Sequence, residues 1–191
     1  MTTDAADAAL VQRMAGGDEA ALRLLLTRHR AMLLRFATHV AHDRGLAEDA
    51  LQEALTAAWR YAAGFRGECT VRAWLATLVR HAVWKQLKRA RGEAPEGPTE
   101  LEVLGARAGW GDPGLGSRIE SVVASRECLE HAFARLHDGD REVLALVDIE
   151  GASLDEACAA LELGLAALKS RLHRARLRMV AALREEECDA R

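Results

Sequence analysis

Residues that build sheets, span membranes or hold metals are scarce in this sequence. Aromatic residues make up only 4% of the 191 residues, and alanine and leucine supply most of the apolar character. Alanine, leucine, arginine and glutamate favour helices, whereas the β-branched residues that favour strands are few. We therefore expect an all-α protein.

Cysteine is also sparse, with single residues at positions 69, 128, 158 and 188. None has the CxxC or Cys/His spacing of a zinc site. No segment approaches the roughly 20 apolar residues of a membrane span, and the polar, acidic start of the chain is unlike a signal peptide. We expect no metal, no cofactor, no membrane segment, and reduced thiols in the cytoplasm.

Proline is absent outside one stretch. All three prolines and seven of the fifteen glycines fall between residues 92 and 116, where acidic residues also outnumber basic ones. Such a stretch cannot hold a continuous helix. It predicts a flexible, Gly/Pro-rich acidic linker at residues 92–120, joining a helical domain at 5–91 to a second at 121–186.

In the first domain, helical periodicity predicts a bundle. Asp18 is placed to cap a helix that runs to about residue 42, and a third helix is expected at 47–62. Thr70 is placed to cap a fourth helix that ends near Arg91. We assign Trp59 and Trp74 to the core.

The third predicted helix carries an acidic and polar face, formed by Glu48, Asp49, Gln52 and Glu53. Residues three and four apart share one side of a helix. A catalytic site would need a nucleophile or a metal beside these groups, and nothing nearby supplies one. Two interpretations remain: a surface that docks a protein partner, or a helix face that is only solvated.

Two basic clusters interrupt a chain whose net charge is -3. Residues 80–91 and residues 169–178 each contain five Lys or Arg and no acid. The local distribution of charge indicates the binding partner better than the net charge of the chain does. Two such clusters therefore favour binding to a polyanion, with two solvated helix faces as the alternative. Trp84 lies among the first cluster, where an aromatic ring can stack on an unpaired base.

The second domain shows the plan of a helix-turn-helix. Asp140 is placed to cap a helix that runs through Ile149, and Ser153 with Glu156 has the spacing of a capping box for a short helix. A turn at 162–164 then leads into a long basic helix. Its apolar residues at 168, 172, 175 and 179 predict a buried stripe, so the basic residues face outward. Such a helix fits the DNA major groove, with a solvated amphipathic helix as the alternative.

The order of these motifs resembles a known family. The segment 47–53, then Trp59, Phe65-Arg66-Gly67, Trp74-Leu75 and Arg80 are similar to region two of extracytoplasmic-function (ECF) sigma factors. Arg141, the segment 148–153, Glu156 and the segment 169–176 resemble their region four. The two resemblances cover about residues 8–91 and 121–184.

The resemblance implies an alternative sigma factor that binds core RNA polymerase and promoter DNA under the control of an anti-sigma factor. Docking on the polymerase clamp would involve Glu48, Asp49, Gln52 and Glu53. The minus-ten element would be bound by Phe65, Arg66, Gly67, Glu68, Arg80, His81, Trp84, Lys85 and Lys88. The minus-thirty-five element would be bound by Ser153, Lys169, Ser170, Arg171, Arg174 and Arg176.

The chain departs from the family pattern at several positions. It has His81 and Lys85 where the family often has Asn and Asp, and Ala167 and Leu168 where the recognition helix often opens with Thr and Val. Glu162 stands where the turn often has glycine, and Gly164 is expected to supply the flexibility instead. These changes bear on which promoter is bound rather than on promoter binding itself.

Two other classes of protein compete with this interpretation. A helix-turn-helix regulator acting at operators usually dimerises, but no heptad seam is evident and the first domain would have no role. An enzyme is disfavoured because the sequence has no phosphate loop, nucleophile elbow or metal cluster. A sigma factor is expected to be a monomer when free and to bind duplex promoter DNA poorly.

Overall fold

The computed structural model describes residues 3–91 and 126–189, and these residues form helices without any strand. The expected linker at 92–120 lies outside the described residues. The first group of helices is α1 (Thr3–Ala15), α2 (Glu19–Ala41), α3 (Arg44–Tyr61), a 3-10 turn (Ala62–Gly64) and α4 (Val71–Arg91). The second is α7 (Arg126–Ala134), α8 (Asp138–Leu144), a π-helical segment (Ala145–Ile149), α9 (Leu154–Leu161) and α10 (Leu165–Asp189). The all-α prediction is confirmed.

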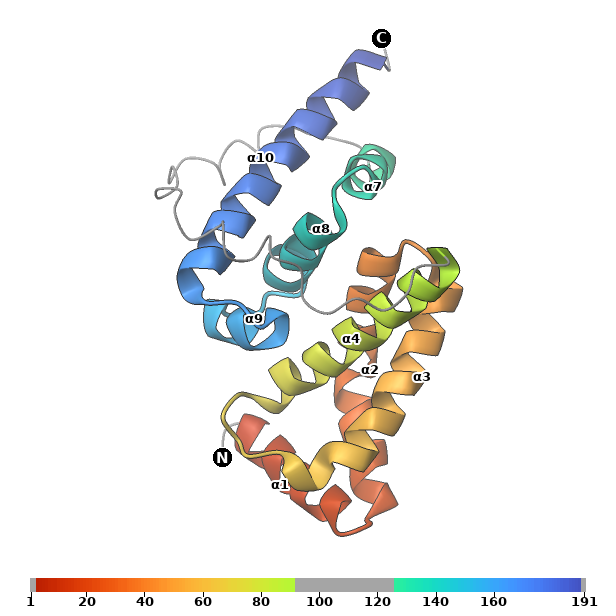
Figure 1. The fold of residues 1–191 in the computed structure, drawn as a ribbon, viewed down its shortest axis with the longest axis vertical. Helices are drawn as coiled ribbons and strands as arrows, with labels where there is room; N and C mark the ends of the chain where they lie inside the picture. The colour runs from red at the N-terminus through yellow and green to blue at the C-terminus, as the bar shows by residue number, and fades with distance from the viewer. Residues whose placement is uncertain (1–2, 92–125, 190–191) are drawn as a thin grey trace.

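The two groups of helices pack against each other. Figure 1 shows α1–α4 gathered at one end of the molecule and α7–α10 at the other, with α4 lying beside α9. One continuous apolar core runs through both groups, from Leu33 and Phe36 of α2 to Leu161 and Leu168 of the second group. The two halves of the chain therefore meet through a packed interface.

Side-chain caps fix where the first helices begin. Asp18 accepts hydrogen bonds from the N–H groups of Ala20 and Ala21 at 2.9 and 3.2 Å, as the sequence predicts. Thr70 accepts one from the N–H of Ala73 at 3.2 Å, which confirms it as the cap of α4. The third helix begins earlier than expected, because Asp43 accepts from the N–H of Leu46 and starts the helix at Arg44.

Two predictions about α3 and α8 are wrong. Trp59 is 36% exposed, because the alanines at 47, 50, 54 and 58 form the buried face of α3 and leave the ring at its edge. The predicted helix does run through Ile149, with a π-helical segment at its end, but Asp140 does not cap it. His137 caps α8, and Asp140 is buried and accepts a hydrogen bond from Arg178.

The turn between α9 and α10 differs from expectation in one residue. Glu162, not Gly164, adopts the left-handed conformation, with φ 56° and ψ 39°. The N–H of Leu163 then donates to the carbonyl of Cys158 at 3.0 Å, which closes the end of α9. An L-residue pays roughly 1 kcal/mol for this conformation, whereas glycine adopts it readily. The structure thus places a strained residue at the centre of the helix-turn-helix.

Candidate polymerase and nucleic-acid interfaces

The acidic face of α3 is divided between an open part and a part that turns toward α4. Asp49 and Gln52 are exposed, and Glu48 is exposed and accepts from Arg44 Nε at 2.9 Å. Glu53 is half-buried; it pairs with Lys85 and accepts from Gln86 Nε2 at 3.2 Å. The four predicted docking residues share one helix, and only Glu53 is held by the neighbouring helix.

The loop between the 3-10 turn and α4 has one anchored residue and an exposed tip. Phe65 is half-buried and packs against Trp74, with ring centroids 5.1 Å apart. Arg66, Gly67 and Glu68 are exposed. Gly67 has φ +72°, a backbone conformation that favours glycine. The loop therefore presents a sharply turned polar tip from a fixed aromatic base.

The predicted minus-ten residues of α4 point in two directions. Arg80 and Trp84 face α8 and α9, and the side chain of Arg80 is only 14% exposed. His81 and Lys85 are more exposed, and Lys88 is half-buried. The five residues thus lie on one helix, but the second group of helices covers the part of α4 that carries Arg80 and Trp84.

The helix-turn-helix forms as the sequence predicts. Ser153 Oγ accepts from the N–H of Glu156 at 3.2 Å, and the Glu156 carboxylate accepts from the N–H of Ser153 at 3.0 Å. The capping box is therefore confirmed. Leu168, Leu172, Ala175 and Met179 are all buried, which also confirms the apolar stripe of α10.

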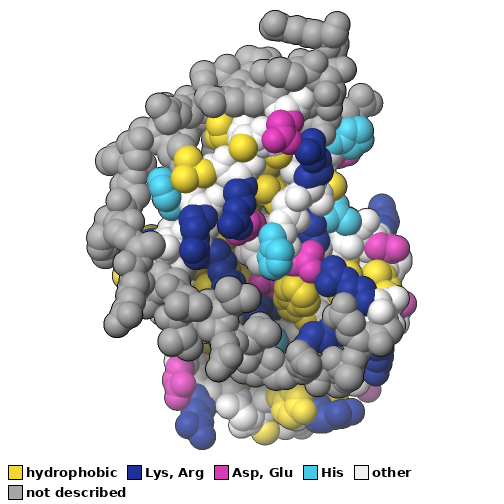
Figure 2. All heavy atoms as spheres, turned by 45° about the horizontal axis from the view of Figure 1, so that its top comes forward, with side chains coloured by type: hydrophobic (Ala, Val, Ile, Leu, Met, Phe, Trp, Pro, Cys, Tyr) yellow, Lys and Arg dark blue, Asp and Glu magenta, His cyan; other side chains and the backbone are white. Residues whose placement is uncertain are grey.

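Outward-facing side chains of α10 include most of the predicted minus-thirty-five residues. Arg174 is exposed, whereas Lys169, Ser170 and Arg171 are half-buried. Arg176 forms a bidentate ion pair with Asp148, at 3.0 and 2.6 Å, so its guanidinium is already engaged. Figure 2 shows that Lys and Arg side chains gather on this view of the molecule beside histidine and acidic side chains.

Sequence reasoning missed a set of carboxylates that cross between the two groups of helices. Glu142, Glu150 and Glu162 contact residues of α2 or α4, and Glu156 contacts Thr70, the cap of α4. Their partners in the first group of helices lie at least 58 positions away along the chain, so no helical spacing reveals them. Of these four residues, only Glu162 stands out in the sequence, because it occupies a turn position where glycine is more favourable.

Two histidines at the end of α2 pack against α7. The ring centroids of His39 and Phe133 are 5.5 Å apart, and those of His42 and Phe133 are 5.9 Å apart. Burial lowers the pKa of His39 below its ordinary value of 6.5. Burial and then the charge of Arg141 lower the pKa of His42. Burial therefore favours the neutral form of both rings.

Acidification should weaken this contact. A histidine whose folded pKa is depressed contributes its full stability above the unfolded value of 6.5 and loses it as pH falls below that value. The charged groups that act on the two rings are Glu150, Arg35, Glu130, Arg141, Asp138 and, on His42, His39 itself. We expect the melting temperature to fall between pH 7 and pH 5.5, and the double variant His39→Gln/His42→Gln to lose much of that dependence. The exposed His131→Gln should keep the wild-type slope, and equal slopes in all three proteins would contradict the prediction.

The described residues form neither a membrane-spanning helix nor a metal-binding cluster. None of their helices is long and apolar enough to cross a membrane. Within the same residues, no group of three or more His, Cys, Asp or Glu side chains could hold a metal ion.

Comparison with known proteins matches both halves of the chain. Residues 25–93 match the family Sigma-70 region 2, and residues 126–179 match Sigma-70, region 4. The ECF RNA polymerase sigma factor SigM of Mycobacterium tuberculosis is 30% identical over 178 residues, covering 93% of this chain and 84% of SigM. The RNA polymerase sigma factor CnrH of Cupriavidus metallidurans is 30% identical, covering 96% of this chain and 97% of CnrH.

A solved structure agrees with these sequence matches. The structure of CnrH in complex with the cytosolic domain of CnrY aligns with a TM-score of 0.66 at 26% identity, over 95% of this chain and 99% of CnrH. Two family regions in order, a helix-turn-helix with a capping box, and relatives matched over nearly their whole length all agree. The chain belongs to the ECF sigma factors of the sigma-70 family.

Proposed function

We propose that this chain directs core RNA polymerase to a small set of promoters through three surfaces, and that an anti-sigma factor controls it. One observation carries the proposal: region 2 and region 4 occur in order in one chain, and each contributes a helix with a basic cluster, α4 and α10. The relative CnrH was solved in complex with the cytosolic domain of CnrY, which supports control by a bound protein.

The first surface is the acidic face of α3, formed by Glu48, Asp49, Gln52 and Glu53. Asp49 and Gln52 are exposed and one helical turn apart, so they can pair with a basic partner helix at the same time. Exposed carboxylates of this kind also steer a basic partner during encounter. We assign docking on core polymerase to this surface.

The second surface holds the minus-ten element and combines the loop Phe65–Glu68 with α4. A base that is flipped out of the duplex is bound by its exposed edge in a pocket, and the polar loop tip with its glycine turn suits such contacts. Arg80, His81, Trp84, Lys85 and Lys88 supply cationic and aromatic side chains for the opened strand.

The third surface is the outward side of α10 with the cap of α9. Lys169, Ser170, Arg171, Arg174 and Arg176 are the side-chain types that bind guanine edges or phosphates. Ser153 lies at the N-terminus of α9 and is already hydrogen-bonded to Glu156, so its contribution would be to position the backbone near a phosphate. We assign the minus-thirty-five element to this surface.

The function as a DNA-binding transcription regulator follows from the family. We further propose that the chain has no catalytic activity of its own, acts in the cytoplasm and is a monomer when free. A stable dimer that binds operator DNA without polymerase would instead support the competing regulator.

Run-off transcription tests the proposed function. Purified core polymerase is given fragments of the source genome with and without this protein, and transcript starts are mapped. Discrete new starts that need the protein support the proposal and give the promoter sequence. Absence of new starts, together with failure to co-elute with core polymerase, would reject it.

Replacing Arg174 should weaken binding of the minus-thirty-five element. A side chain that contacts a base edge contributes about 1–3 kcal/mol, so Arg174→Ala is expected to lower transcription from the mapped promoters about tenfold or more. Arg23→Ala removes an exposed arginine from α2 and should have little effect. The proposal for α10 fails if both variants transcribe equally well.

A further inference from the structure

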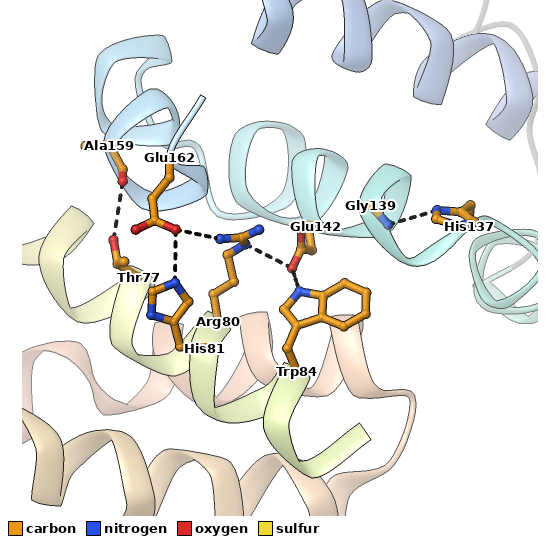
Figure 3. A network of polar contacts seen from close by, with 9 residues as sticks. All are labelled: Thr77, Arg80, His81, Trp84, His137, Gly139, Glu142, Ala159 and Glu162. Atoms are coloured by element: carbon orange, nitrogen blue, oxygen red, sulfur yellow. Dashed lines mark hydrogen bonds and ion pairs between the residues drawn. The ribbon is translucent and has the colours of Figure 1, made fainter. Parts of the chain in front are cut away.

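Two sets of contacts hold α4 in place, one along its length and one at its start. Figure 3 shows the first, in which Arg80 points toward Glu142 and Glu162 of the second group of helices. The second set comes from α1, which lies beside the segment that leads from α3 into α4 (Figure 1). The match to Sigma-70 region 2 begins at residue 25, so α1 lies outside the matched residues.

Asp4 of α1 reaches the first residue of α4. Its Oδ1 accepts a hydrogen bond from the backbone N–H of Val71 at 3.0 Å. The first four N–H groups of a helix have no partner within the helix, and a carboxylate also interacts favourably with the positive end of the helix dipole. Thr70 caps the same helix through the N–H of Ala73. The start of α4 therefore has two side-chain caps, one local and one from a residue 67 positions away along the chain.

The same helix also meets the other end of the loop Phe65–Thr70. The 3-10 turn that precedes the loop packs against α1, and the N–H of Phe65 donates to the carbonyl of Ala62 in that turn at 3.2 Å. Burial raises the pKa of the Cys69 thiol and the charge of Asp4 raises it further, which agrees with a position of Asp4 near the end of the loop. Both ends of the loop are thus held next to α1.

The position of α1 is itself well defined by α2. Three of its apolar side chains are buried in the core: Leu10, Val11 and Met14. Asp7 is 2% exposed and pairs with Arg28, and its Oδ2 lies 2.7 Å from His29 Nε2. A buried carboxylate is stable only with such partners. A helix that is fixed in this way can restrain the loop through Asp4.

We propose that Asp4 is a positioning residue for the minus-ten element: it caps α4 from α1 and so fixes the backbone from which the loop Phe65–Thr70 presents its polar tip. Asp4 acts through the loop and is assigned no contact with DNA. The proposal rests on the proposed function, because it assumes that this loop holds a base of the minus-ten element.

Preorganisation of the loop is the physical basis of this role. Arg66, Gly67 and Glu68 at the tip are exposed, so their position depends on how the two ends of the loop are held. Without the cap from Asp4, the first turn of α4 can fray. Affinity for the base then falls in proportion to the fraction of molecules whose loop keeps the competent conformation.

The test compares three variants of the full chain, each bound to core polymerase. Asp4→Ala removes the cap, and no cavity results because Asp4 is exposed. Asp4→Asn keeps an oxygen that can accept from the N–H of Val71, and asparagine caps helices as well as aspartate does. Asp43→Ala is the matched control, because it removes a cap of the same kind from the start of α3.

The first readout is the affinity of each holoenzyme for a single-stranded oligonucleotide that carries the mapped minus-ten sequence. Asp4→Ala should bind about fivefold more weakly than wild type, the ratio that corresponds to the free energy of one helix cap. This loss should disappear on an oligonucleotide with an abasic site at the position whose base matters most to wild type, because the loop then has no base to hold. Asp4→Asn and Asp43→Ala should bind both oligonucleotides like wild type.

Hydrogen exchange of the free chain reports the cap without DNA or polymerase. The backbone amides of residues 65–73 should exchange faster in Asp4→Ala than in wild type or in Asp43→Ala. Unchanged exchange in Asp4→Ala would overturn the proposal. So would an equal loss of affinity on the intact and the abasic oligonucleotide, or an Asp4→Asn holoenzyme that binds as weakly as Asp4→Ala.

Failure of this proposal differs in its readout from failure of the proposed function. Run-off transcription with the wild-type chain reports the function whether or not Asp4 positions the loop. Discrete wild-type starts, together with an Asp4→Ala holoenzyme that binds the minus-ten strand normally, would reject only the role of Asp4.

Discussion

Changing Asp49 and Gln52 together to alanine is expected to reduce promoter-specific transcription at least tenfold while leaving the fold intact. Both side chains are exposed on α3, so their removal leaves no cavity and no buried group without a partner. Truncation of a central interface residue typically costs 1–2 kcal/mol or more. Two losses of about 1 kcal/mol each weaken binding by roughly 30-fold, and larger losses weaken it further. The effect should appear as a higher concentration of protein needed for half-maximal transcription.

The matched control for this experiment is Glu19→Gln, which changes an exposed acid at the start of α2. It should transcribe like wild type. Competition for core polymerase against a labelled wild-type chain separates docking from DNA binding. If Asp49→Ala/Gln52→Ala competes as well as wild type, α3 is not the docking surface, whatever its effect on transcription.

The second large effect is expected at Arg141, a buried arginine of α8. Its guanidinium donates to the carbonyls of Ala134 and Leu136 at 3.1 and 2.7 Å, and it pairs with Asp138. It also reaches the carbonyl of Val40 on α2 at 3.4 Å. One side chain thus joins the end of α7, the start of α8 and the end of α2.

Arg141→Met should therefore destabilise the chain by about 3 kcal/mol or more, because it keeps an apolar stem but leaves buried acceptors without donors. For a chain of this size that loss corresponds to a fall in melting temperature of roughly 6–12 °C. Arg135→Met removes an arginine whose ion pair with Glu185 is exposed, and its effect should stay within about 0.5 kcal/mol. Equal melting temperatures for the two variants would show that water replaces Arg141 at these carbonyls.

Local features were predictable from the sequence because they depend on near neighbours. Asp18, Thr70 and the Ser153–Glu156 box cap helices where their spacing predicts. The stripe from Leu168 to Met179 is buried as its periodicity indicates. Such features need only the three- and four-residue repeat of a helix.

Features that depend on the other half of the chain were not predictable. Trp59 has helical spacing consistent with the core, but small alanines already fill that side of α3. Asp140 has the residue type of a cap, but His137 starts α8 and Arg178 takes the carboxylate. The carboxylates that meet Arg80 lie 62 and 82 residues away, and only the packed structure brings them together.

The proposed binding surfaces were also predictable only in part. Residue type and spacing place Asp49 and Gln52 on one exposed face of α3, which the structure contains. They do not indicate that Glu53 and Lys85, assigned to different partners, pair with each other. Nor do they indicate that Arg176 is engaged by Asp148.

The left-handed glutamate at the turn of the helix-turn-helix has a genetic consequence. Glutamate and glycine codons differ by a single nucleotide, and glycine is the residue that fits φ 56° best at position 162. That one change would relax the backbone and remove the carboxylate that holds Arg80 and His81. A variant with a less strained turn, and without this contact between the turn and α4, is therefore one base away from the wild-type gene.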